Sequence, residues 1–384
     1  MKLFTCTHCG NRVFFENLSC EVCHATLGYV PAEQTMVAFA TDDDGHWRRL
    51  GPDGPAYRPC SNYANEHVCN WMVPADSPHQ LCASCRTTHT IPALGKPQNR
   101  AYWHALEQEK RRLFYTLIEL GLPTPNKLDD PVNGLSFEFL EETSPKARVL
   151  TGHDEGVITL NIAEADDAQR ERIRLSMHEP YRTLLGHFRH EIGHYYWDRL
   201  IRNTPWIDEC RALFGDETID YADALKRHYA APRADWPQHF ISVYASSHPW
   251  EDWAETWAHY LHMADTADTA MSFGVDATNV ELASDLFTPD DLWLPGHPGA
   301  ARFLDFLNGW VLLTNVLNEL SRSMGQPDYY PFVLPRVAVG KLQFIHCVIT
   351  EQRDGPASTG AAPAAEPAPA QSQTQSQEQN AAQS

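Results

Sequence analysis

Apolar residues recur at helical spacing through most of the chain beyond residue 98. Between Asn99 and Leu120 they return every three or four positions, which predicts a helix that Gly121 and Pro123 bring to an end. The same spacing predicts three further helices, at about Pro180–Arg202, Pro249–Met263 and Ala301–Ser323. Residues 337–350 are again apolar, and we expect them to pack back onto the core.

Three short segments alternate between apolar and polar positions, as half-buried strands do. These segments are residues 135–140, 147–151 and 156–162. The run His153-Asp154-Glu155-Gly156 between the last two is typical of a hairpin turn. We therefore expect a short antiparallel sheet before the helix at 180–202, and an α+β fold in which a mainly helical domain carries this sheet.

The two ends of the chain differ from this pattern. Residues 1–95 are rich in Cys, Gly, Pro and Asn and show no long helical period, and residues 96–98 make a plausible boundary. From residue 355 onward the sequence contains only Gly, Pro, Ala, Ser, Thr, Gln, Asn and Glu, which cannot build a core. The expected organisation is an N-terminal module at 1–95, a larger domain at 98–353 and a disordered tail at 354–384.

The net charge of the chain limits the kinds of molecule that it is expected to bind. The formal net charge of −20 argues against nucleic acid and anionic membrane surfaces as partners. No apolar run approaches the ~20 residues that span a bilayer. The first residues, Met1 to Cys6, do not have the pattern of a secretory signal. We therefore expect a cytoplasmic protein, in a compartment where disulfides are rare.

Eight of the ten cysteines fall in the first 85 residues and are spaced for metal binding. Two Cys-x-x-Cys pairs separated by ten residues predict a zinc ribbon with four thiolate ligands, Cys6, Cys9, Cys20 and Cys23. His8 and His24 lie beside these ligands and could substitute, although four cysteines already complete the shell.

A second set of cysteines is more loosely spaced. A single knuckle can close another four-sulfur zinc site with two further cysteines; the predicted ligands are Cys60, Cys69, Cys82 and Cys85. The alternative is that Cys60 and Cys69 are ordinary buried thiols. Cys210 and Cys347 are left over, and we expect them in the core. These two sites would hold structural zinc, and the module they stabilise could bind a protein partner.

The predicted helix at 180–202 contains His190-Glu191-Ile192-Gly193-His194. Residues four apart lie on one helical face, so both imidazoles can reach a single zinc ion. Glu191 can then act as the general base for a zinc-bound water without being a ligand. A solvated polar face is the alternative, but the neighbouring aromatic residues indicate burial. Gly193 would let another segment approach closely.

The segment Pro249 to Tyr260 is helical, rich in tryptophan, and carries Glu251 and Glu255 on one face. A catalytic zinc site needs a third protein ligand. A carboxylate that holds a ligating histidine by its other ring nitrogen is also common. This segment can supply both groups, although spacing alone does not say which carboxylate has which role.

The combination of His190–His194 with Glu251-x-x-Ala254-Glu255 resembles the gluzincin metallopeptidases. Residues 1–353 more closely resemble a bacterial family, named largely from its motif as zinc-binding metallopeptidases, that joins an N-terminal zinc-ribbon module to an HExGH domain. The stretches Cys69–Trp71, Leu81–Cys85 and His259–His262 add to this likeness. The resemblance implies that Glu251 is the third ligand and that Glu255 holds a ligating histidine. The interval between His194 and Glu251 is longer than in aminopeptidase-type gluzincins and leaves room for a helical insertion.

The expected function is hydrolysis of peptide or amide bonds, with one catalytic and two structural zinc ions and a peptide or protein as substrate. Such a site also needs a group that stabilises the developing oxyanion. The candidates for this group are Tyr244, His248, Tyr260 and His262. The alternative is a zinc-stabilised interaction protein in which the HExxH helix holds a structural or vestigial metal. A fourth strong protein ligand would favour that alternative, and an open position would favour the hydrolase.

Overall fold

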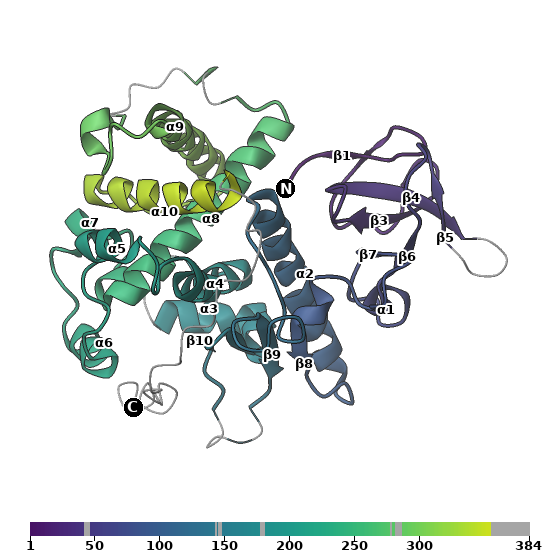
Figure 1. Cartoon of the computed structure of the whole chain (residues 1–384), viewed down its shortest axis with the longest axis horizontal. Helices are drawn as coiled ribbons and strands as arrows, with labels where there is room; N and C mark the ends of the chain where they lie inside the picture. The colour runs from purple at the N-terminus through teal and green to yellow at the C-terminus, as the bar shows by residue number, and fades with distance from the viewer. Residues whose placement is uncertain are drawn as a thin grey trace.

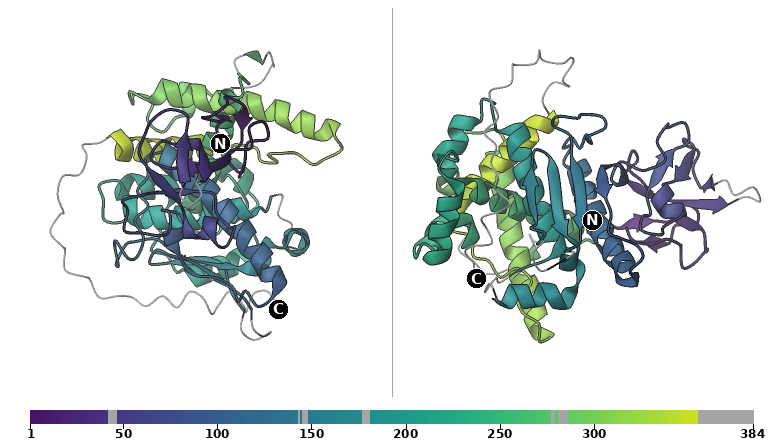
Figure 2. Two further views of the ribbon diagram at one scale, coloured as in Figure 1. Left: turned by 90° about the vertical axis from the view of Figure 1, so that its right-hand side faces the viewer. Right: turned by 90° about the horizontal axis from the view of Figure 1, so that it is seen from below.

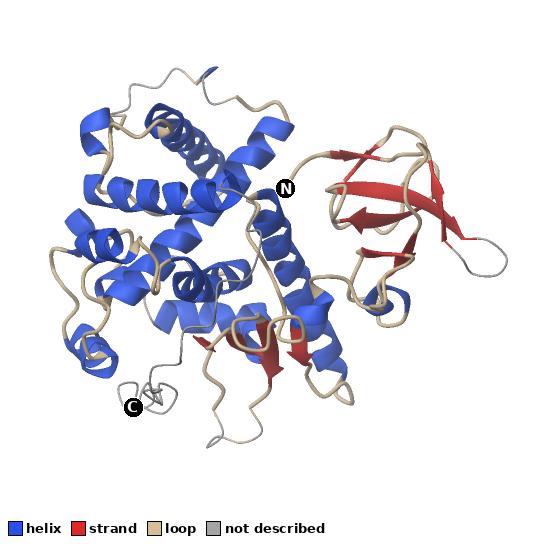
Figure 3. Cartoon of the chain, viewed as in Figure 1, coloured by secondary structure: helices blue, strands red, loops and turns tan. Residues whose placement is uncertain are grey.

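The structure is a computed structural model that describes residues 1–41, 47–142, 144, 148–176, 181–276, 279–280 and 286–354. A strand-rich N-terminal part stands beside a larger, mainly helical part, and helix α2 (Pro97–Glu119) lies between them (Figure 1). Strands are concentrated in the N-terminal part and in one sheet of the helical part (Figure 3). The α+β fold expected from the sequence is confirmed. The expected tail at 354–384 lies, from residue 355 on, outside the described residues.

The N-terminal part is made of three small antiparallel sheets. The first pairs β1 (Phe4–Thr5) with β2 (Arg12–Val13), and the second has the order β3-β4-β5 (Thr26–Val30, Thr35–Thr41, Trp47–Leu50). The third pairs β6 (Tyr57–Pro59) with β7 (Met72–Pro74), and the short helix α1 (Ser61–Ala64) separates them in sequence. Strands β3 and β4 bury most of their residues, among them Leu27, Tyr29 and Val37, so the cysteine clusters add to a small apolar core.

The sheet of the helical part has four strands in the order β10-β11-β9-β8 (Gly152–Asp154, Val157–Asn161, Ser136–Leu140, Thr88–Thr90). The β10–β11 hairpin is antiparallel, as predicted, and turns through Glu155 and Gly156, both at positive φ. Strand β9, however, pairs in parallel with both β11 and β8. The sheet is therefore mixed, because β10 reverses the chain between β9 and β11.

Two further differences from the predicted strands concern their ends. The strand expected at 147–151 is replaced by β10, which begins at Gly152; residues 145–147 lie outside the described part. The fourth strand, β8, was not expected and comes from the cysteine-rich region. Seen from below, the sheet stands between the N-terminal strands and the helices of the C-terminal half (Figure 2).

Helices make up most of the remaining described chain. The longer ones are α2, α4 (Leu184–Leu200), α8 (Pro249–Ser272), α9 (Ala300–Ser323) and α10 (Arg336–Asp354). The shorter ones are α3 (Asp167–Ser176), α5 (Ile207–Phe214), α6 (Tyr221–Ala230) and α7 (Trp236–His239), together with single turns η1 (Cys85–Thr87), η2 (Ile162–Ala165), η3 (Tyr244–Ser246) and η5 (Pro289–Asp291). None of the described helices combines the length and apolar character that a membrane span requires.

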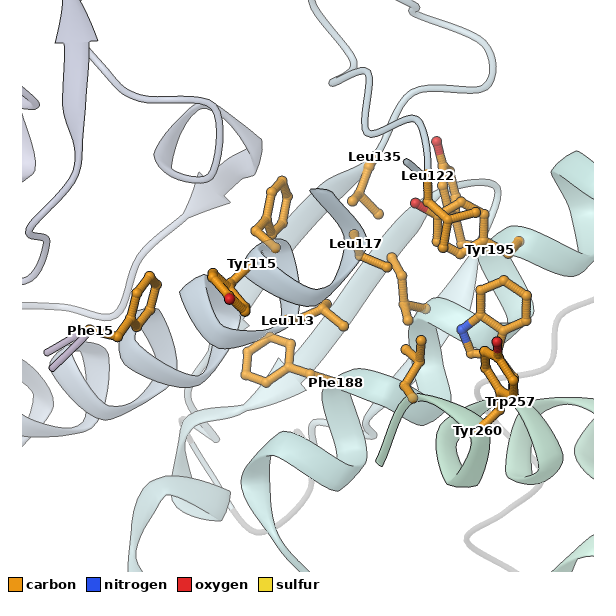
Figure 4. Close-up of a cluster of buried hydrophobic side chains, with 14 of the residues drawn as sticks. Phe15, Leu113, Tyr115, Leu117, Leu122, Leu135, Phe188, Tyr195, Trp257 and Tyr260 are labelled. Carbon is orange, nitrogen blue, oxygen red and sulfur yellow. The ribbon is translucent and has the colours of Figure 1, made fainter. Parts of the chain in front are cut away.

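A continuous aromatic and aliphatic core joins the two parts of the molecule (Figure 4). Phe15 of the N-terminal part contacts Tyr115 of α2 edge-on, with ring centroids 5.3 Å apart. On the other side of α2, Phe188 of α4 packs against Phe137 of β9 at 5.7 Å. The fully buried apolar face of the sheet therefore rests on α2 and α4, and its other face remains available to line a cavity.

Helices α4 and α8 pack at unusually short range because of Gly193. A Cβ atom placed on Gly193 would lie 3.0 Å from the Cα of Ala254. The indole Nε1 of Trp253 donates to the Gly193 carbonyl oxygen at 2.9 Å. The close approach expected at this glycine is present, and it brings the acidic start of α8 beside the HEIGH segment of α4.

Candidate active site

Helix α4 begins at Leu184 rather than near Pro180, which lies outside the described residues. Thr183 caps the helix, since its Oγ1 accepts a hydrogen bond from the Gly186 amide at 3.0 Å. One turn apart on this helix, His190 and His194 present their rings to the same space, with centroids 5.0 Å apart. The predicted pairing of the two imidazoles on one helical face is present in the structure.

Helix α8 brings Glu251 to these imidazoles from its first turn. Pro249 starts the helix, and the Nδ1 of His248 accepts a hydrogen bond from the Trp250 amide at 3.1 Å. The Oε2 of Glu251 lies 3.0 Å from the Nε2 of His190 and 3.5 Å from the Nε2 of His194. The three side chains thus converge on one point.

These three groups fit a zinc ion. Glu251 is 2% exposed, and among the described residues its Oε2 has no partner besides the two imidazole Nε2 atoms. One candidate ligand atom from each side chain lies within 4.8 Å of the others. Two imidazole nitrogens and one carboxylate oxygen are the donor set of an open catalytic zinc site. Among the described residues, the group at this centre contains no fourth candidate ligand.

Glu255 supports His190 from its other side. The Nδ1 of His190 lies 2.8 Å from the Oε1 of Glu255, and the Oε2 of Glu255 accepts a hydrogen bond from Ser242 at 2.6 Å. An Nδ1–H donating to Glu255 leaves the Nε2 lone pair free for a metal. Burial lowers the pKa of His190, but its contacts with Glu251 and Glu255 outweigh burial and raise the pKa well above its usual value.

Glu191 is buried beside the two histidines and lines the same cavity. Burial raises the pKa of its carboxyl group, while His190 and His194 act in the opposite direction. A carboxylate with a raised pKa can take a proton from water and release it again at moderate pH. Its position therefore suits the general base expected from the motif.

The three candidate ligands and Glu191 border a cavity of about 420 Å³. One wall is formed by residues 150–155, which include the edge strand β10, and by β11. The opposite wall comes from α4, the first residue of α6, the turn η3 and the start of α8. An edge strand beside the candidate metal centre leaves one row of backbone groups unpaired within the sheet.

Two tyrosines reach the cavity from the segment between α4 and α8, where an insertion was expected. Tyr221, the first residue of α6, donates from its hydroxyl to the Oε1 of Glu251 at 2.6 Å. Tyr244 of η3 lies with its ring 5.9 Å from that of His190. Burial raises the pKa of both hydroxyls well above the usual value, so both remain protonated donors.

The other candidates for oxyanion stabilisation make different contacts. His248 caps α8 and its Nε2 lies 3.2 Å from the Ile219 carbonyl oxygen. The Tyr260 hydroxyl pairs with His346 at 2.8 Å, and His262 pairs with Arg189 at 2.7 Å. None of these three lines the cavity formed by the described residues, whereas Tyr244 does.

Sequence reasoning missed Tyr221 and His153, which also line the cavity. Tyr221 stands thirty positions before Glu251 in a segment without a recognisable motif, so nothing local indicated the contact. His153 had been assigned only to a hairpin turn. Its Nε2 accepts a hydrogen bond from the Gly156 amide at 3.0 Å, and burial lowers its pKa to about 3, so the ring stays neutral.

The eight N-terminal cysteines form two clusters, as their spacing predicted. Sulfur atoms 2.3 Å from a tetrahedral zinc lie ~3.8 Å from one another. The separations are 3.7 Å for Cys6–Cys23, 3.6 Å for Cys9–Cys20 and 3.8 Å for Cys69–Cys82. The second cluster, Cys60, Cys69, Cys82 and Cys85, is fully buried. Cys210 and Cys347 are buried outside both clusters.

Comparison with known proteins agrees with this arrangement. Residues 3–96 match a zinc-ribbon domain family, and residues 99–348 match the family described as "Putative zinc-binding metallo-peptidase". Uncharacterized proteins of Mycobacterium tuberculosis and Mycobacterium bovis are 42% identical over 355 residues, which cover 91% of this chain and 96% of each relative. No solved structure matches the chain. The chain therefore belongs to this zinc-binding metallopeptidase family and carries an N-terminal zinc-ribbon domain.

Proposed function

We propose that this chain is a zinc-dependent hydrolase of peptide or amide bonds. The observation that supports this most directly is the convergence of His190, His194 and Glu251 beside a buried Glu191, at a cavity bordered by an edge strand. A zinc ion held by the three groups supplies a Lewis acid that makes water nucleophilic near neutral pH. Three protein ligands rather than four favour this function over a structural or vestigial metal site.

The residues of the chain have separate roles in this proposal. An extended peptide lies beside β10, whose outer backbone groups can pair with it as an added strand. Glu191 accepts the proton of the attacking water and passes it to the leaving amine. The Tyr244 hydroxyl donates to the carbonyl oxygen as negative charge develops there. Tyr221 and Glu255 keep Glu251 and His190 in position.

A peptide-library digestion tests the proposal. The zinc-loaded wild type should cleave a subset of peptides, and Glu191→Gln should keep its zinc but lose about 10²–10⁴-fold in turnover. Tyr244→Phe should lose about 10²–10³-fold, since one oxyanion donor is removed. If no peptide is cleaved by the zinc-loaded wild type, or if Glu191→Gln is as active, the proposed function is wrong.

The cellular compartment is part of the same proposal. All ten cysteines are free thiols in the structure, and eight of them lie in the two clusters that suit zinc. Thiolate clusters of this kind persist where disulfides are rare. These clusters support our proposal that the protein is cytoplasmic. If fractionation of cells that produce the protein recovers it outside the cytoplasmic fraction, this part of the proposal is wrong.

A further inference from the structure

The part of the cavity that the sheet forms is acidic. Glu138 of β9, Asp154 at the end of β10 and Glu155 in the following turn all line it. Asp154 and Glu155 are exposed to solvent, and the Glu138 side chain is 30% exposed. The imidazole of His89, itself exposed, lies 3.4 Å from Glu138. One of these carboxylates thus comes from β9, and the other two come from the β10–β11 hairpin.

The register of the sheet leaves an open path to Glu138. Gly152 of β10 is opposite Thr159 of β11, and Thr159 is opposite Glu138 of β9. Residues opposite one another in neighbouring strands share a face of the sheet. A Cβ placed on Gly152 would meet no atom of the described residues within 4 Å, so the sheet face is open at this position. A long side chain of a ligand can therefore cross Gly152 and Thr159 toward the carboxylate.

The net charge of the cavity lining is negative even with zinc present. Among the described residues, five carboxylates and one ammonium group line it, and that ammonium group, on Lys127, is bound to the carbonyl oxygens of Val132 at 2.9 Å and Glu155 at 2.6 Å. A divalent zinc would offset two of the carboxylates. The chain as a whole carries a formal charge of −20. Clefts lined by one sign of charge concentrate ligands of the other sign.

We propose that this cleft selects peptides with a lysine or arginine side chain next to the bond to be cleaved. The inference rests on the proposed function, and it names the substrate class for that same site. The candidate metal ligands and Glu191 line the same cavity, so a peptide bound there for hydrolysis would also meet these carboxylates. The acidic wall then determines which peptides enter: Glu138, Asp154 and Glu155 attract the cationic side chain and repel an acidic one.

Binding and cleavage should be measured separately. Binding uses zinc-loaded Glu191→Gln and hexapeptides that carry lysine, norleucine or glutamate at each position in turn. Lysine should bind about tenfold more tightly than norleucine at one position or more, and glutamate more weakly than either. The preference should shrink between 0.05 M and 0.5 M salt, because the carboxylates are partly exposed. The same peptides are then digested with the wild type.

A pair of double variants makes the test specific. Glu138→Gln/Asp154→Asn should reduce the preference for lysine over norleucine severalfold. The control is Asp208→Asn/Glu209→Gln on α5, which changes the total charge equally at two exposed positions that do not line the cavity and should keep the preference. Equal binding of lysine and glutamate peptides, or an unchanged preference in the first variant, would overturn the inference. Preferential binding of lysine peptides without cleavage of any peptide would refute only the proposed hydrolase function.

Discussion

Replacing Gly193 with alanine tests the packing that brings the three candidate ligands together. The added Cβ would lie 3.0 Å from the Cα of Ala254 and 3.2 Å from the Cβ of Trp257. Carbon atoms in contact prefer a separation of about 3.5–4.0 Å. Because the nearest atom is backbone, α8 has to move away from α4 by a few tenths of an ångström.

This displacement exceeds the tolerance of a metal site. Ligand distances in such sites hold to within about 0.2 Å. Glu251 moves with α8, whereas His190 and His194 stay on α4, so zinc affinity at this centre should fall at least about tenfold, as it does when ligand support is lost. Overpacking costs about 1–3 kcal/mol, and the helix preference of alanine returns about 1 kcal/mol. The net loss of unfolding free energy should therefore be about 0–2 kcal/mol.

Zinc affinity is best measured by chelator competition with the cysteine sites kept occupied, and stability by urea denaturation of the same samples. The matched control is Gly340→Ala inside α10, where the added Cβ would lie 3.4 Å from a Trp293 side-chain atom, an ordinary contact. This control should keep its zinc affinity and gain slightly in stability. If Gly193→Ala binds the third zinc as tightly as the control does, the close packing of α4 on α8 does not set the metal geometry.

Four further results are expected. Metal analysis of the purified protein should find three zinc ions per chain, and a single zinc would contradict the two cysteine sites. Glu251→Ala should lose the third zinc, whereas Glu255→Ala should weaken it about 10–100-fold; the opposite order in a zinc titration would reverse the two roles. Lys341→Met leaves the fully buried Asp252 without its partner at 2.5 Å and should cost about 3–5 kcal/mol in urea unfolding, and a change below 1 kcal/mol would show that water reaches the pair. Burial lowers the pKa of His346 to about 4, so the unfolded chain binds a proton before the folded one does, and the free energy of unfolding should fall by about 3 kcal/mol as the pH decreases from 6.5 to 4. His346→Gln should flatten that part of the plot of stability against pH, and identical plots for wild type and variant would refute this assignment.

Local spacing made the metal-binding groups readable from the sequence. The Cys-x-x-Cys knuckles and the pair His190 and His194 are each formed by residues three or four positions apart on a turn or a helix. The hairpin turn at Glu155 was readable for the same reason, since positive φ angles favour particular residues there. Helix α4 begins later than expected because Thr183 caps it, and one threonine is a weaker signal than a proline.

Contacts between distant segments could not be read in this way. The parallel pairing of β9 with β11 depends on β10 lying at the edge of the sheet, and no residue of β9 indicates that arrangement. Tyr221 reaches Glu251 because α6 folds back over the start of α8, after a loop whose course has no periodic pattern. The parts of the fold and the site that were missed are those that tertiary packing decides.

Strand β8 follows the turn η1, which begins at Cys85, and forms the outer edge of the sheet whose opposite edge borders the cavity. The N-terminal part therefore cannot be removed or exchanged without removing a strand from this sheet. Trimming the chain to residues 98–353 would uncover β9, including the apolar Phe137 and Phe139, as a new open edge ready to pair with other chains. A shortened chain should aggregate for this reason alone, and a lack of activity in it would say nothing about whether the N-terminal part contacts a substrate.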